Sequence, residues 1–241
     1  ELIDQLSESE LDSVELGEKL KIVDPLLGLV NSNKFDVIDY SKNDQLRVLI
    51  YFFDKFDLLT TYQVSLCTLM NFLGAVYNEY KHIPFHNFNF AVDATQFVYY
   101  EIIQGNLVSN FNKLELLILL ISCICHDMGH SGRLGSLNAK AQVPLGILYK
   151  EQSVMETFHC SSLIKILSVP KNNIIAEMDD EHTTNFWTSV FDCILATDIG
   201  QHKKIIEEAE AKLNNSDGSF DLKNPRNKQL LLRFLVKCKS F

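Results

Sequence analysis

The 241-residue sequence has no hydrophobic run long enough to cross a membrane. The most apolar run, residues 116–125, is ten residues long, whereas a membrane-spanning helix needs about 20. The N-terminal segment is acidic and lacks the basic start and apolar core of a secretory signal. We therefore expect no membrane span and a cytoplasmic (intracellular) location.

Clustered positive charge is also missing. The chain has 22 Lys and Arg against 31 Asp and Glu, and its formal net charge is −9. Binding to a phosphate backbone needs a concentrated basic face, so these numbers exclude a general nucleic-acid surface. Metal ions could still hold a small anionic substrate locally.

The cysteines do not have the spacing of a disulfide framework or of a four-cysteine zinc site. All six stand singly or as Cys-x-Cys within apolar stretches. We interpret them as buried thiols in a reducing compartment: Cys67, Cys123, Cys125, Cys160, Cys193 and Cys238.

Alternating strand patterns are short and isolated, and no fixed-period repeat occurs. Apolar residues instead recur at three-to-four spacing in residues 46–56, 64–80, 91–104, 114–125, 153–167, 187–197 and 229–238. The pattern predicts an all-α fold, a compact multi-helix bundle over residues 34–241. Residues 1–33 are acidic and weakly periodic, and we expect them to be a lead-in to this domain. Residues 214–224 are expected to form a surface loop.

The strongest motif is ICHDMGH at residues 124–130, at the end of the most apolar block. An imidazole beside a carboxylate offers two ligands to a divalent ion, and a buried helix would fix the direction of both. His130 follows four residues after His126 and strengthens a metal-site interpretation. The alternative is a helix end at which His130 complements the dipole and Asp127 is solvated. The motif alone leaves both interpretations open.

Upstream lies PFHN at residues 84–87. A histidine at a helix start, such as His86, suits a general acid that protonates a leaving oxygen near neutral pH. The alternative is a partly buried histidine that caps the helix.

Two polar groups follow downstream. Glu156 and His159 are three residues apart and share a helix face, where they could hydrogen-bond metal-bound water or orient metal ligands. Thr197 and Asp198 close another apolar block. Taken alone, Glu156 and His159 would more often be ordinary polar positions at a core edge, and the alternative for Thr197 and Asp198 is a simple helix end.

Taken in order, the four groups resemble the catalytic domain of the class I cyclic-nucleotide phosphodiesterases, all-helical metal-dependent hydrolases of the HD-domain type. The resemblance runs from about residue 35 to residue 238. It includes DKFDLL at residues 54–59 and PLGILY at residues 144–149. It implies a cyclic-nucleotide substrate, divalent metals (zinc with magnesium or manganese), and possible protein partners in a larger assembly.

The resemblance also implies residue roles. His86 would protonate the leaving ribose oxygen, while His126 and Asp127 would ligate the metals and Asp127 would bridge them. The remaining polar residues would surround the metals or hold metal-bound water: His130, Glu156, His159, Thr197 and Asp198.

The sequence departs from the family pattern at the metal ligands. The family places a ligating histidine four residues after the acid, where this chain has Phe90, and a closing aspartate where it has Ser240. An acidic residue of the family motif is replaced by Gly129. The matched sequence also ends before the family's C-terminal helices, which hold the nucleotide base, so we expect no purine pocket.

These departures predict a phosphodiesterase-type domain with lost or much reduced hydrolysis, retained as an interaction or scaffold module. The alternative is an active 3′,5′-cyclic-nucleotide phosphodiesterase that holds its metals through fewer protein ligands and more water. A third interpretation is a regulatory module that binds cyclic nucleotide without cleaving it.

Overall fold

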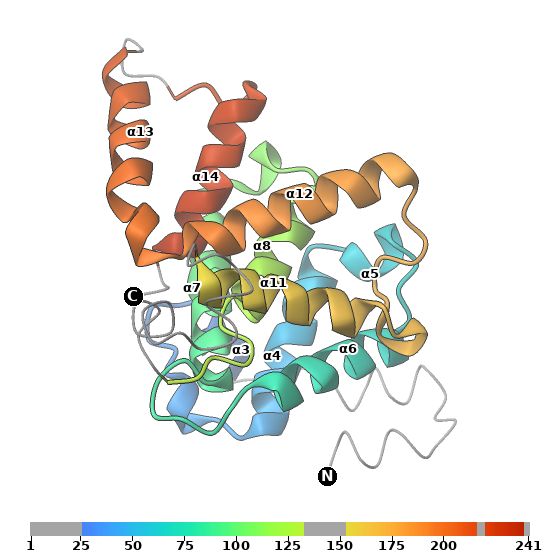
Figure 1. The fold of residues 1–241 in the computed structure, drawn as a ribbon. Coiled ribbons are helices and arrows are strands. Elements are labelled where there is room, and N and C mark those ends of the chain that lie inside the picture. Colours follow the sequence, from blue (N-terminus) through green and yellow to red (C-terminus); the bar gives the residue numbers. More distant parts are fainter. Residues whose placement is uncertain (1–25, 133–152, 216–219, 239–241) are drawn as a thin grey trace.

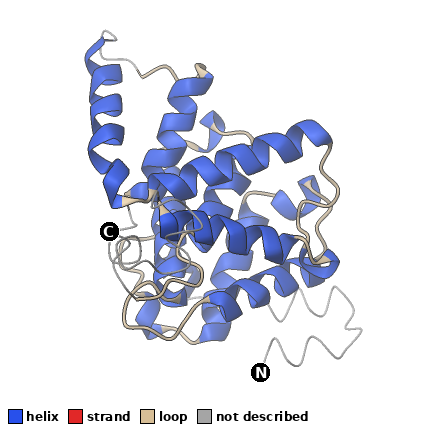
Figure 2. Cartoon of the chain, viewed as in Figure 1, coloured by secondary structure: helices blue, strands red, loops and turns tan. Residues whose placement is uncertain are grey.

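The structure is a computed structural model and describes residues 26–132, 153–215 and 220–238. Every regular element in these ranges is a helix (Figure 2), which confirms the predicted all-α fold. In the same ranges, none of the helices combines the length and the apolar character that a membrane span requires.

The α-helices are α3 (Leu26–Val30), α4 (Lys42–Lys55), α5 (Leu58–Thr61), α6 (Leu66–Glu79), α7 (Phe88–Gln104), α8 (Lys113–Cys125), α11 (Val154–Leu167), α12 (Asp180–Ala196), α13 (His202–Asn215) and α14 (Pro225–Lys237). Short 3-10 turns connect them: η1 (Val37–Asp39), η2 (Val108–Asn110), η3 (Pro170–Asn172) and η4 (Ile199–Gln201).

Polar side chains cap the N-termini of the helices that carry the site. The Asn87 side chain accepts a hydrogen bond from the Phe90 N–H and caps α7. Asn112 and Glu115 form a reciprocal capping box at the start of α8. Each cap satisfies N–H groups that a helix start leaves without intrahelical partners. The caps therefore fix where α7 and α8 begin, and with them the positions of the residues just outside.

Helix α8 is the centre of the core. All residues from Leu116 to Cys125 are buried, and α7, α12 and α14 pack around the helix (Figure 1). Burying one Leu or Ile side chain contributes roughly 1.5–3 kcal/mol, so this run anchors α8 firmly. The anchored helix places the residues that follow Cys125 at a fixed point inside the molecule.

The helix pattern differs from the sequence expectation in α12 and α13, and also in the short α5, which lies between two predicted blocks. Helix α12 begins at Asp180, before the predicted block, because its first turns are polar and carry little apolar periodicity. Helix α13 was not predicted; it is rich in Glu and Lys and leaves only a narrow apolar stripe. The cysteine interpretation was wrong for Cys67 and Cys238, which are exposed.

The start of the described chain packs into the same core. Leu26 and Val30 are buried there, and the Gln96 amide donates hydrogen bonds to the Val30 and Ser32 carbonyls at 2.9 and 3.1 Å. Helix α3 is therefore attached to α7 by both apolar packing and hydrogen bonds. Residues 1–25 of the expected lead-in lie outside the described residues.

Candidate metal centre

The site is built around Asp127, which follows α8 and is only 7% exposed. The Tyr80 hydroxyl donates to the Ile124 carbonyl at 2.8 Å and accepts the Asp127 N–H at 3.4 Å. These two bonds connect the end of α6 to the end of α8 and hold the carboxylate in place. Sequence reasoning missed Tyr80, since a contact across 47 residues has no local pattern.

A glycine allows the chain to turn sharply after Asp127. Gly129 has a φ of +71°, and a Cβ atom there would lie 2.7 Å from a ring carbon of Phe158 on α11. Only glycine accepts this backbone conformation at no cost together with so close a neighbour. The turn brings His130 back towards the carboxylate.

His126 has the hydrogen bonding of a metal ligand. Its Nδ1 lies 2.8 Å from the Cys123 carbonyl, which can only accept, so Nδ1 carries the proton. The buried Nε2 lies 3.3 Å from Asp127 Oδ2 and has no hydrogen-bond partner. Metal-ligating histidines are commonly held by such a bond from the other ring nitrogen.

His159 meets the carboxylate from α11. Its Nδ1 donates to the Met128 carbonyl at 2.5 Å, and its Nε2 lies 3.9 Å from Asp127 Oδ1. Burial lowers the pKa of His159 to about 4, so this imidazole is neutral at physiological pH. Two buried imidazole nitrogens, His126 Nε2 and His159 Nε2, therefore lie 3.3 and 3.9 Å from the oxygens of one carboxylate.

His86 approaches Asp127 from the loop before α7. Its Nδ1 lies 2.7 Å from Asp127 Oδ2, and its backbone has a φ of +55°. The hydrogen bond to Asp127 raises the pKa of His86. Burial alone would raise the pKa of Asp127, but the imidazoles of His126, His86 and His159 outweigh burial and hold it well below its ordinary value.

His130 completes a group of three donors. Its ring stacks on that of His86 with centroids 4.1 Å apart, and its Nδ1 accepts the Gly132 N–H at 3.1 Å. One ligand atom each of His86, Asp127 and His130 lie within 4.8 Å of one another. Within the described ranges, this is the group of three His, Cys, Asp or Glu donors that could hold a metal ion.

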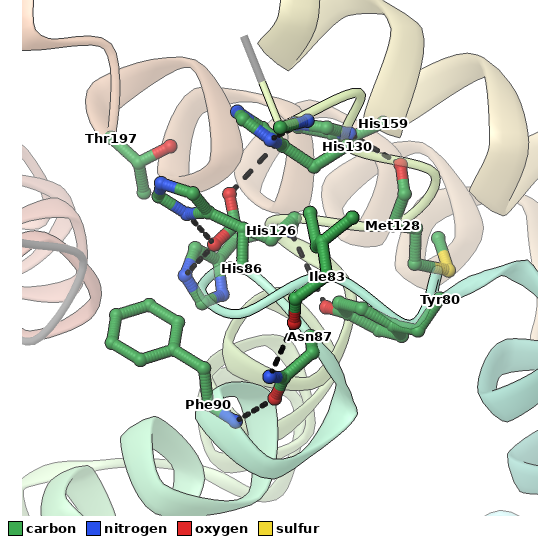
Figure 3. Close-up of polar contacts among 12 residues, drawn as sticks. Tyr80, Ile83, His86, Asn87, Phe90, His126, Met128, His130, His159 and Thr197 are labelled. Atoms are coloured by element: carbon green, nitrogen blue, oxygen red, sulfur yellow. Dashed lines mark hydrogen bonds and ion pairs between the residues drawn. The ribbon is translucent and has the colours of Figure 1, made fainter. Parts of the chain in front are cut away.

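Phe90 occupies the other side of the centre. Its ring centroid lies 5.7 Å from that of His126 and 5.8 Å from that of His86 (Figure 3). A phenyl ring has no lone pair to donate to a metal. Ser240, the second position at which the sequence lacks an expected ligand, lies outside the described residues. The described residues thus bring His126 Nε2 within 3.3 Å of Asp127 Oδ2 but place no donor atom at position 90.

Glu156 lies in the first turn of α11. Burial raises its pKa to about 7, and the negative charges of Asp198 and Asp127 act in the same direction. Thr197 closes α12, and its hydroxyl donates to the Ile194 carbonyl at 2.7 Å.

Asp198 lies at a junction of α11, α12 and α14. Its Oδ2 accepts from the Ser153 hydroxyl at 2.7 Å, and its Oδ1 accepts the Gly200 N–H at 2.7 Å. The buried Lys237 of α14 donates to the Ala196 and Asp198 carbonyls at 2.8 and 3.1 Å. Sequence reasoning missed Lys237, although a lysine within an apolar helix was a signal that it has buried partners.

The fold and the site define a class: an all-helical domain with a carboxylate among histidines at the end of its central helix. A model of the 3′5′-cyclic nucleotide phosphodiesterase family matches residues 85–240. The chain belongs to this family. Members of the family use divalent metals, in keeping with the His and Asp group described above.

Two curated relatives illustrate the similarity. The 3′,5′-cyclic-nucleotide phosphodiesterase regA of Dictyostelium discoideum is 33% identical over 206 residues, covering 85% of this chain and 26% of that protein. The high affinity cGMP-specific 3′,5′-cyclic phosphodiesterase 9A of Mus musculus is 30% identical over 204 residues, covering 85% of this chain and 38% of that protein. The chain thus spans well under half the length of either relative.

A solved structure supports the same fold. The crystal structure of the phosphodiesterase domain of the RhoPDE fusion protein, from the choanoflagellate Salpingoeca rosetta, matches with a TM-score of 0.84 at 24% identity. The match covers 95% of this chain and 69% of that one.

Proposed function

We propose that this domain keeps the phosphodiesterase fold with lost or much reduced hydrolysis, and acts in the cytoplasm as an interaction or scaffold module. The observation that carries the proposal is the ring of Phe90 against His126. It puts a ring without donor atoms beside His126, whose buried Nε2 has no hydrogen-bond partner.

Ligand number decides how tightly such a site holds metal. Catalytic zinc sites use three protein ligands and structural ones four. Changes that only disturb the support of a ligand already cost 10–100-fold in metal affinity or activity. His126 and Asp127 alone would therefore hold zinc, magnesium or manganese weakly, and a weakly held metal cannot sustain turnover.

The remaining residues have roles within this proposal. His86 is the inherited general acid, and cyclic nucleotide is the inherited substrate. His130, Glu156 and His159 surround the carboxylate or hold water near it, together with Thr197 and Asp198. The cGMP specificity in the name of the mouse relative makes cGMP the first substrate to test.

The test is turnover of cGMP and cAMP by the purified chain in Mg²⁺ or Mn²⁺. We expect a rate at least 100-fold below the typical enzyme value of about 10 s⁻¹. His126→Ala should leave any residual rate unchanged, since that rate would come from contaminants. A rate of about 1 s⁻¹ or more that His126→Ala abolishes would instead support the active enzyme.

A further inference from the structure

We propose that His86, Asp127 and His130 form a binding site for one divalent cation, displaced from the family's metal position. Their donor atoms already lie within 4.8 Å of one another. The inference rests on the proposed function in one respect: His86 would serve as a ligand because it is no longer needed as an acid.

Phe90 is the reason for the displacement. Its ring lies beside His126 and His86 and contributes no donor there. His130 lies on the other side of His86, its ring stacked at 4.1 Å (Figure 3). Nitrogen donors are therefore available on the side away from Phe90.

The donor set suits a divalent transition metal. Two imidazoles and one carboxylate with open positions bind first-row divalent ions, and imidazole favours zinc, copper, nickel or iron over magnesium. Asp127 supplies a buried negative charge. The Tyr80 hydroxyl accepts a hydrogen bond from the backbone N–H of Asp127 and so holds this residue in place. His86 and His130 are only partly buried, so an ion can reach them from solvent.

Binding requires small movements of two side chains. The rings of His86 and His130 lie face to face, with 28° between their planes, and the ion needs their nitrogens turned towards Asp127. Rotation about the last side-chain bond of histidine is soft. His130 would exchange its hydrogen bond from the Gly132 N–H for a bond to the ion.

Occupation of this site has a consequence for catalysis. A nitrogen of His86 that is bound to a cation cannot carry the proton that a leaving oxygen needs. The domain would then bind metal with a defined stoichiometry and still not hydrolyse cyclic nucleotide. Metal content and turnover, which are linked in an active enzyme, become independent measurements here.

The experiment is titration of the purified chain with Co²⁺, followed by its visible absorption and by competition with a chromophoric chelator. We expect one Co²⁺ per chain. His86→Ala and His130→Ala should each weaken binding at least tenfold, while His126→Ala should weaken it less than either of these changes. His182→Ala is the matched control. His182 is exposed and pairs with Asp179, three residues earlier, and both residues lie far from the proposed ligands in the sequence. Circular dichroism establishes that each variant is folded.

Three results would overturn the site, of which the first two are no Co²⁺ binding at millimolar concentration and unchanged affinity in His130→Ala. The second result concerns a variant of His130, which is partly exposed. It can therefore be measured even if the variant of the buried His126 does not fold. Stronger weakening by His126→Ala than by His130→Ala would place the ion at the family's position. Absent Co²⁺ binding overturns the site and leaves the proposed function intact. Cyclic-nucleotide turnover by the Co²⁺-loaded protein would contradict both the proposed function and the loss of the acid role of His86.

Discussion

The ring of Phe90 lies 5.7 Å from the ring of His126, tilted by 50°. Phe90 belongs to α7 and His126 ends α8, so the contact joins two helices that pack along each other in the core. A chain that keeps the His126–Asp127 pair therefore need not keep the ability to bind two metal ions. The chemistry of the centre depends on what faces the pair from the neighbouring helix.

Tyr80→Phe tests how the carboxylate is held. The change removes the hydroxyl that donates to Ile124 and accepts from Asp127, leaving a buried carbonyl without that donor. We expect a loss of about 1–2 kcal/mol in the free energy of unfolding, measured by urea denaturation. Tyr62→Phe is the control, because the half-buried Tyr62 makes no such bond to α8, and equal losses in the two variants would contradict this role.

Alanine substitutions at Gly129 and Gly132 test the turn that follows Asp127. Gly129 and Gly132 both have positive φ, so alanine at either position costs about 1–2 kcal/mol in backbone strain. Alanine at 129 also meets Phe158 at 2.7 Å, whereas alanine at 132 meets Ile83 only at 3.7 Å. We expect Gly129→Ala to lose at least about 1 kcal/mol more than Gly132→Ala in thermal unfolding. Adding Phe158→Leu should recover part of that excess, and no recovery would rule out the ring contact as its cause.

The raised pKa of Glu156 predicts that the free energy of unfolding depends on pH. Burial raises its pKa from 4.5 to about 7, so the folded state favours the protonated form. Its contribution is fully present below pH 4.5 and is lost as the pH rises through 7. Glu156→Gln does not ionise, so its stability relative to the native chain should rise by about 1–3 kcal/mol between pH 4.5 and pH 8.

Urea denaturation at both pH values, with a chelator present, measures this difference. Glu177→Gln is the control because Glu177 is exposed, and its difference from the native chain should stay flat. A flat profile for Glu156→Gln as well would show that burial of this carboxyl does not bear on stability.

Helical periodicity and motif order were sufficient to predict much of this molecule. The apolar block before His126 predicted α8, and the His-Asp pair follows directly at the end of that helix. The stacking of His130 on His86 could not be predicted, because it depends on how a loop and a turn 44 residues apart meet in space. Helix α13 was missed for a different reason: its few apolar residues, such as Ile205, pack only against a small second cluster.

The central claim is that the phenyl ring at position 90 weakens metal binding at the His126–Asp127 pair. Isothermal titration with Mn²⁺ of Phe90→His, alone and combined with Ser240→Asp, tests it most directly. We predict that Phe90→His gains at least tenfold in Mn²⁺ affinity over the native chain and that the double variant gains more. Phe85→His is the matched control, since Phe85 is exposed and its ring contacts the rings of Phe90 and His86, each with centroids 5.0 Å apart. An affinity in Phe90→His no higher than in Phe85→His would contradict the claim.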